Sequence, residues 1–201
     1  MALKKGEKYE VIIEAATKVI ARHGYYEAKV SQIAKEAGLG DGTVYLYFKN
    51  KQDILISVVE EKMGNFIELL KERLATKQDC LGKLYQLVET HFDFLSQDFN
   101  LALFTQVELR QANREIRAGI EPTIKEYYSL INKIIEKGIE EKVFSENLNK
   151  RAAASMIFGT LDETMTSWVM RDGRFDIHAR VEPVYDLLIN GLKGKVKGKK
   201  V

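Results

Sequence analysis

The segment from residue 30 to residue 48, VSQIAKEAGLGDGTVYLYF, is the part of the sequence that most restricts the fold. It predicts two short helices joined by a tight turn. The side chain of the first helix that faces the second must be small, and Ala34 meets this requirement. Gly38 lets the backbone leave the first helix in a left-handed conformation at little steric cost. The spacing is typical of a helix-turn-helix, although an ordinary helical corner in a bundle has a similar pattern, and that alternative stays open.

The second helix of this segment is predicted to begin near Asp41, whose carboxylate can cap it. Val44 and Phe48 lie four residues apart, so they share one buried face. An earlier helix over residues 7 to 23, ended by Gly24, has apolar residues at helical spacing. Together the three helices predict a compact head of the size of known helical DNA-binding modules.

The rest of the sequence predicts further helices and no strand, so the fold class is all-α. Asn147 is the expected cap of one helix, and a helix boundary is expected near Pro122, because proline cannot donate a backbone hydrogen bond. We expect a DNA-binding domain over residues 1–50, a ligand-binding and dimerisation domain over 51–193, and a flexible basic tail over 194–201. The helical patterns after the head cover residues 53–74, 81–95, 101–107, 110–143, 147–170 and 182–192.

Composition fits a protein of the cytoplasm. A chain of 201 residues with 45% hydrophobic content can bury a substantial core. The single cysteine, Cys80, excludes an intramolecular disulfide, and no secretory signal or membrane-spanning segment is apparent, so no membrane partner is expected. The net charge of +2 does not by itself indicate a nucleic-acid partner, because such a partner is signalled by clustered charge.

The predicted head has groups for both parts of duplex DNA. Phosphates provide affinity and base edges provide specificity. Thr43 can meet a phosphate with its hydroxyl and its backbone N–H at the start of a helix. The alternative for the two tyrosines is packing against the first helix, which we expect more for Tyr45 than for Tyr47. The other candidate DNA contacts are Tyr47 and Lys51 for phosphates, Gly42, Tyr45 and Leu46 for the major groove, and Lys29 and Gln32 as weaker phosphate ligands.

One head covers too little DNA for specific binding, so we expect a homodimer on double-stranded operator DNA. The last two helices have more apolar surface than one small core needs, which favours them as the dimer surface; plain core packing is the alternative. The apolar residues in question are Met156, Ile157, Leu161, Met165, Trp168, Val169, Val184, Leu187, Leu188 and Leu192.

The middle of the chain has enough large apolar residues to line a ligand cavity between helices. Most such residues in any protein are simply core, and that interpretation stays open. Arg110, Arg114 and Arg117 would share one helical face, where guanidinium groups suit phosphates, unless Glu108 and Glu115 pair with them on a solvated surface. The predicted apolar lining is Phe66, Leu70, Leu84, Leu87, Phe92, Leu103, Phe104, Phe158 and Trp168.

Catalytic and metal-binding patterns are weak. His91 with Asp93, and His178 with Asp176, lack the further ligands of a metal site, so core or solvated roles are expected. No set of Ser, His and Asp can be assembled and Cys80 has no evident base partner, so we expect neither an enzyme nor a cofactor.

Residues 33 to 55, with the core TVYLYFKNKxDIL, resemble the DNA-binding domain of the TetR family of bacterial transcriptional regulators. The resemblance implies that the positions of Thr43, Tyr47 and Lys51 touch the DNA backbone. Members often have Thr at the cap before the second helix of the head, whereas this sequence has Lys29.

The segments LALFTQVELRQANREIR and MIFGTLDETMTSWVMRD resemble the body of the fatty-acid degradation regulators of Gram-positive bacteria, which are TetR-type repressors that bind long-chain acyl-coenzyme A (acyl-CoA). This resemblance implies that a cavity holds the acyl chain and that basic groups, with Arg110 and Arg114 as candidates, meet the coenzyme A phosphates. The expected function is a repressor of fatty-acid degradation genes that long-chain acyl-CoA releases from its operator. The alternatives are a TetR-type regulator that senses another hydrophobic molecule, and a lipid carrier or acyl-transfer enzyme that does not bind DNA.

Overall fold

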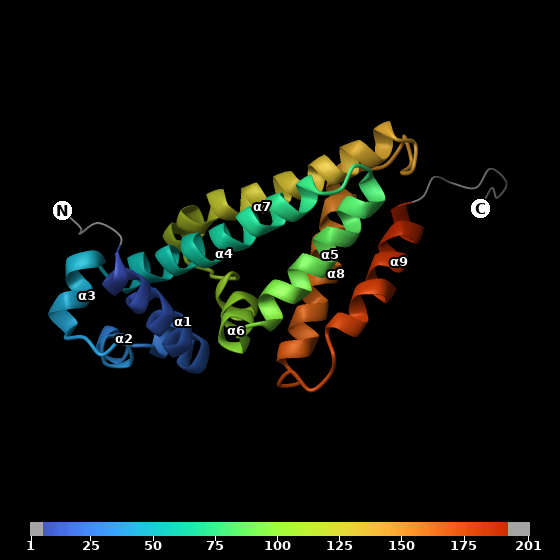
Figure 1. Ribbon diagram of the computed structural model, residues 1–201. Helices are drawn as coiled ribbons and strands as arrows, with labels where there is room; N and C mark the ends of the chain where they lie inside the picture. Colours follow the sequence, from blue (N-terminus) through green and yellow to red (C-terminus); the bar gives the residue numbers. More distant parts are fainter. Residues whose placement is uncertain (1–5, 193–201) are drawn as a thin grey trace. The chain divides into compact units, whose positions relative to one another are not determined.

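The computed structural model describes residues 6–192, and every element in this range is helical (Figure 1). The all-α class is therefore confirmed. None of these helices is long and apolar enough to cross a bilayer. The elements are α1 (Glu7–Glu27), α2 (Val30–Glu36), α3 (Asp41–Tyr47), α4 (Lys51–Ala75), α5 (Cys80–Ser96), α6 (Phe99–Glu108), α7 (Arg114–Glu140), α8 (Lys150–Val169), the 3-10 helix η1 (His178–Arg180) and α9 (Val181–Leu192).

The described residues form two compact units. The first contains residues 6–66 and 98–124, and the second contains residues 67–97 and 125–192. Each unit thus takes one piece from each half of the chain, and α4 and α7 contribute residues to both. The domain limits expected from the sequence, with a boundary after residue 50, stay a prediction.

In the first unit α1 packs against α2 and α6, and α2 packs against α3. The apolar face of α1 is fully buried at Ile12, Ala16 and Ile20. The helix is interrupted at Gly24, which has φ 74° and ψ 154°, and it resumes for one turn to Glu27. The sequence predicts that Gly24 ends this helix, and its backbone does leave the helical region there.

In the second unit α5 packs against α8 and α9, and α8 packs against α9. Side-chain caps fix where two of these helices start. The carboxylate of Asp79 accepts a hydrogen bond from the Gly82 N–H of α5 at 2.7 Å, and the amide oxygen of Asn149 accepts one from the Ala152 N–H of α8 at 3.0 Å. The cap of α8 is therefore Asn149, and the expectation of Asn147 is wrong.

The predicted helix boundary near Pro122 is wrong, because α7 runs from Arg114 to Glu140 with this proline inside it. Pro122 leaves the Ala118 carbonyl without its helical donor. Both residues are exposed, so water can satisfy that carbonyl. The helix ends where the Phe144 ring packs on its backbone: a Cβ on Gly138 would lie 2.1 Å from a ring carbon of Phe144.

Candidate functional sites

The turn between α2 and α3 has the predicted geometry. Gly38 has φ 67°, and its N–H donates to the Lys35 carbonyl at 3.1 Å while the Leu39 N–H donates to the Ala34 carbonyl at 2.9 Å. These bonds satisfy the last carbonyls of α2. No atom lies within 4 Å of the Cβ that Gly38 lacks, so its backbone conformation, and not crowding, requires glycine here.

Helix α3 presents an aromatic and aliphatic surface to solvent. Val44 and Phe48 are buried as predicted, while Tyr45 is 54% exposed and Leu46 is 55% exposed. Gly42 is exposed as well. The exposed parts of these large side chains can contact thymine methyl groups in a major groove.

Two details of the predicted start of α3 are wrong. Asp41 does not cap the helix, because the capping position is Gly40 and no side chain bonds there. The backbone N–H of Thr43 donates to the Gly40 carbonyl at 2.9 Å, so it is used inside the turn. Thr43 can therefore offer a phosphate its hydroxyl, but not the backbone group that the sequence suggested.

The two tyrosines of α3 have exchanged their expected roles. The Tyr47 ring is half-buried with its centroid 6.4 Å from the Tyr9 ring of α1, and Tyr9 stacks on Phe48 at 5.2 Å. Tyr45 lies in solvent. The tyrosine that packs towards the first helix is therefore Tyr47 and not Tyr45.

At the start of α2, Gln32 has a structural role. Its amide oxygen accepts a hydrogen bond from the Lys29 N–H at 2.8 Å, which helps to begin the helix. Lys29 itself is exposed. Its side chain can reach a phosphate, and the bond to the Gln32 oxygen leaves the amide NH2 of Gln32 as the group that can donate to one.

Lys51 is held by the protein itself. Its ammonium donates to the carbonyls of Tyr26 and Ala28, each at 2.9 Å, and lies 4.7 Å from the centre of the Tyr25 ring. Two of the three N–H bonds of this ammonium are thus used within the first unit.

The arginine cluster does not form the predicted single helical face. Helix α6 ends at Glu108. Helix α7 begins at Arg114, where the Asn113 side chain accepts hydrogen bonds from the N–H groups of Glu115 and Ile116 at 2.9 and 3.1 Å. Arg110 lies in the break, where its guanidinium donates to the Gln106 carbonyl. Arg110 and Arg114 are both exposed.

The alternative in which Glu108 pairs with these arginines on a solvated surface is wrong. Glu108 is 3% exposed and bonds instead to the backbone N–H of Tyr25 and to the side chain of Gln111. No local pattern in the sequence indicates this contact, since Tyr25 and Glu108 are 83 residues apart.

Most of the predicted ligand-lining residues are deeply buried, which is the burial that both a core and a closed apolar cavity require. Trp168 has a different role, because its indole N–H donates to the Phe175 carbonyl at 3.0 Å and so holds the loop after α8. Leu103 and Phe158 are half-buried. The fully buried members are Phe66, Leu70, Leu84, Leu87 and Phe92, together with Phe104.

A buried polar pair lies in the second unit. The His91 Nδ1 is 2.9 Å from the Tyr127 hydroxyl, and the two rings stack with centroids 5.9 Å apart. Burial lowers the pKa of His91 to about 3 and raises the pKa of Tyr127. His91 is therefore neutral at pH 7. Asp93, which the sequence analysis considered together with His91, accepts a hydrogen bond from the Arg73 guanidinium at 2.8 Å. Within residues 6–192 no group of three or more His, Cys, Asp or Glu side chains could hold a metal ion.

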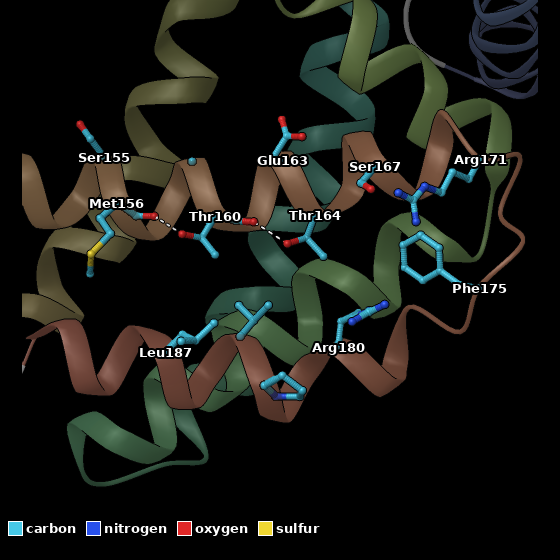
Figure 2. A pocket seen from close by; sticks show the side chains of 13 residues that line it. Ser155, Met156, Thr160, Glu163, Thr164, Ser167, Arg171, Phe175, Arg180 and Leu187 are labelled. Atoms are coloured by element: carbon cyan, nitrogen blue, oxygen red, sulfur yellow. Dashed lines mark hydrogen bonds between the residues drawn. The ribbon is translucent and has the colours of Figure 1, made fainter.

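Helices α8 and α9 enclose an open groove of about 720 Å³ (Figure 2). Eight of the ten apolar residues predicted for a dimer surface are core residues of this unit, and only Met156 and Leu187 are exposed. The groove is instead lined mainly by small and polar side chains. Thr160 and Thr164 turn their hydroxyls back to the carbonyls of Met156 and Thr160, which leaves their methyl groups to the groove.

The chain matches two family models. Residues 12–58 match the model described as "Bacterial regulatory proteins, tetR family", and residues 59–191 match "YsiA-like protein, C-terminal region". The fatty acid metabolism regulator protein of Bacillus subtilis is 47% identical over 192 residues, which cover 96% of this chain and 99% of that protein.

Two solved structures are similar over nearly the same length. The transcriptional regulator FadR from Bacillus subtilis, crystallised in complex with stearoyl-CoA, superposes with a TM-score of 0.87 at 48% identity, and the match covers 92% of this chain and 99% of that one. The fatty acid degradation regulator FadR from Bacillus halodurans gives a TM-score of 0.87 at 48% identity, covering 92% and 100%.

Proposed function

The chain belongs to the TetR family of bacterial regulatory proteins, and from this premise we propose that it represses genes of fatty-acid degradation and leaves its operator when long-chain acyl-CoA binds. The observation that carries the proposal is the similarity, at 48% identity and over 92% of the chain, to a regulator whose crystal structure contains stearoyl-CoA. A regulator of this kind is not an enzyme, and it acts on DNA in the bacterial cytoplasm.

The DNA-facing surface of this proposal is α3. Tyr45, Leu46 and Gly42 are exposed on it and serve as the base-reading residues. The hydroxyls of Thr43 and Tyr47 bind phosphate oxygens, which position the helix without reading sequence. Lys29 adds a charge contact near the start of α2, and Gln32 supports that helix start.

For the effector, the buried apolar residues of the second unit provide the surface for an acyl chain. Phe158 is half-buried, with its ring centroid 5.0 Å from that of Tyr128 and 6.0 Å from that of Tyr127. Such aromatic and aliphatic walls bind a hydrocarbon because both the ligand and the wall leave water. Leu70, Leu84, Leu87 and Phe92 extend this apolar set.

Arg110 and Arg114 are the proposed ligands of the coenzyme A phosphates. Both are exposed, and a guanidinium can give two parallel hydrogen bonds to one phosphate. The exposure of both side chains supports this assignment, because a headgroup that stays near water needs partners at the surface.

Dimerisation is assigned to the groove between α8 and α9. Leu187 is 70% exposed there and Met156 is 37% exposed, while small side chains such as Ser155 and Gly159 let another helix approach closely. A two-fold pair buries the same patch on both copies and brings two heads to one palindromic operator.

Release of DNA then follows from differential affinity. The acyl-CoA binds more tightly to a conformation in which the heads no longer fit successive major grooves, and the population shifts towards that state. Each tenfold loss of operator affinity needs about 1.4 kcal/mol of difference in ligand binding between the two states. A few apolar contacts that exist in only one state are sufficient.

A mobility-shift experiment with the DNA upstream of the protein's own gene tests the DNA part. We expect a shifted band that an excess of unrelated DNA does not remove; the lack of any specific shift would favour the lipid carrier or acyl-transfer alternative. Native mass spectrometry of the purified protein tests the ligand part. An adduct with the mass of an acyl-CoA supports the proposal, whereas an adduct of another hydrophobic molecule would support a regulator with a different effector.

A further inference from the structure

Residues 24 to 28 contain the interruption at Gly24, the last turn of α1 and the link to α2. Gly24 leaves the helical region at φ 74°, and the Ala28 N–H returns to the Gly24 carbonyl at 3.0 Å. Ala28 is 1% exposed, and Lys29 directly after it is the capping residue of α2. The placement of this segment therefore sets where α2 begins.

From one side, Glu108 at the end of α6 holds the segment. Its Oε1 accepts a hydrogen bond from the Tyr25 N–H at 2.8 Å, and its Oε2 accepts one from the Gln111 side chain. Burying a carboxylate is costly unless hydrogen bonds replace its hydration. Burial raises the pKa of Glu108, whereas its bonds to Tyr25 and Gln111 and the charge of Lys51 lower it.

Lys51 at the start of α4 holds the same segment from another side. Its ammonium donates to the carbonyls of Tyr26 and Ala28 and lies against the Tyr25 ring. A backbone N–H is thus bound by a carboxylate of α6, and two backbone carbonyls are bound by an ammonium of α4. The negative carboxylate thus binds a backbone donor, and the positive ammonium binds backbone acceptors.

We propose that Glu108 and Lys51 are positioning residues for DNA binding, which clamp residues 25 to 28 between α6 and α4 and thereby fix the start of α2. This inference rests on the proposed DNA-binding function. It gives Lys51 an action through the protein backbone, in place of the phosphate contact that the sequence suggested. It also gives α6 a direct hold on the head, since a shift of Glu108 would pull on the Tyr25 N–H.

Four variants separate this role from alternatives. Glu108→Leu removes the acceptor, and Glu108→Gln keeps a neutral one. Lys51→Met removes the ammonium but keeps an apolar stem. Glu60→Leu repeats the first chemical change at an exposed glutamate of α4 in the same unit, so it is the matched control. The readouts are amide hydrogen exchange of residues 25 to 33 in the free protein, and operator affinity over a range of salt concentrations.

We expect Glu108→Leu to speed exchange of the Tyr25 amide and to weaken operator binding, each about tenfold or more, because a bond to a charged acceptor is lost. Glu108→Gln should keep both within about threefold of the unmodified protein, since a neutral acceptor retains roughly half of the interaction. Lys51→Met should speed exchange near Ala28 and leave the dependence of binding on salt unchanged. Glu60→Leu should change neither readout.

Two results would overturn the inference. One is an unchanged exchange rate at Tyr25 in Glu108→Leu. The other is a fall of about one in the salt dependence of binding for Lys51→Met without faster exchange, which marks a direct phosphate contact. If Glu108→Leu does not fold, Lys51→Met decides: faster exchange near Ala28 with an unchanged salt dependence supports the clamp, and the second result above overturns it. If the unmodified protein binds no DNA, the proposed function fails, while the exchange rates still test the clamp.

Discussion

Gly119 of α7 lies directly against Ile56 of α4: a Cβ on Gly119 would be 2.4 Å from the Ile56 Cδ1 and 2.9 Å from its Cγ1. Both residues belong to the first unit. Gly119 lies inside the continuous helix α7. The glycine is there because the two helices approach so closely that no side chain fits between them.

Gly119→Ala should therefore destabilise the protein, although alanine is the better helix former. The gain of about 1 kcal/mol from helix propensity is outweighed by an overlap that typically costs about 1–3 kcal/mol in addition to forcing Ile56 to move. The measurement is urea unfolding at one protomer concentration. Gly64→Ala in α4 is the control, because no atom lies within 4 Å of its missing Cβ, and it should stabilise by about 0.5–1 kcal/mol. Equal effects of the two substitutions would contradict the close contact.

Cys80 should be unreactive in the native protein. Burial, followed by the carboxylate of Glu141, raises the pKa of its thiol to about 12, and the side chain is fully buried. Because the thiolate is the reactive form, a chromogenic disulfide reagent at pH 8 should label the folded protein at a negligible rate. The same reagent should titrate one thiol per chain in denaturant. Rapid labelling without denaturant would show that the start of α5 opens readily.

His91 should make stability depend on pH below neutrality. Its pKa is about 3 in the folded protein, against about 6.5 in the unfolded chain. The unfolded state therefore binds the proton first, so stability is complete above pH 6.5 and is lost as the pH falls towards 3. From pH 6 to pH 5 the native protein should lose about 1 kcal/mol more free energy of unfolding than His91→Gln.

The exposed His23 provides the control for that experiment, since His23→Gln should keep the pH dependence of the unmodified protein. The comparison uses equal protomer concentrations, because association also contributes to stability. If His91→Gln and the unmodified protein lose stability in parallel, the burial of His91 does not govern its titration.

Leu187→Glu should separate the proposed dimer. Leu187 lines the groove of α8 and α9 and is 70% exposed within one chain, so a partner would bury it. A carboxylate buried without a partner should weaken association by at least about a hundredfold. Sedimentation velocity of this variant should show a monomer at concentrations where Asp186→Asn, on the same helix and outside the groove lining, stays dimeric. An unchanged dimer in Leu187→Glu would place the interface elsewhere.

The sequence predicts well what depends on neighbours along the chain. The turn of the head follows from Ala34, Gly38 and Val44, which act within a few residues, and all three have the predicted positions. Family membership is confirmed as well. The limits of α5 follow from the apolar spacing and from the break after Ala75.

Predictions from the sequence are wrong where the structure depends on solvent exposure or on contacts between residues far apart in the chain. Pro122 does not end α7; it and Ala118, whose carbonyl loses its helical donor, are both exposed, so water can satisfy that carbonyl. The three arginines do not share a face, since Asn113 starts a new helix between Arg110 and Arg114. Glu108 has the charge of a surface residue, but it is buried with hydrogen bonds from the Tyr25 N–H and the Gln111 side chain. The DNA and ligand contacts of individual residues stay predictions.

The most direct test of the proposed function is the release of the protein from its operator. Fluorescence anisotropy of labelled operator DNA, bound by the full chain, is followed during addition of stearoyl-CoA, with free stearate and coenzyme A as controls. We expect stearoyl-CoA to release the DNA at concentrations where neither control does, because both the apolar chain and the phosphates contribute to binding. Operator binding that stearoyl-CoA leaves unchanged would contradict the proposal that long-chain acyl-CoA is the effector.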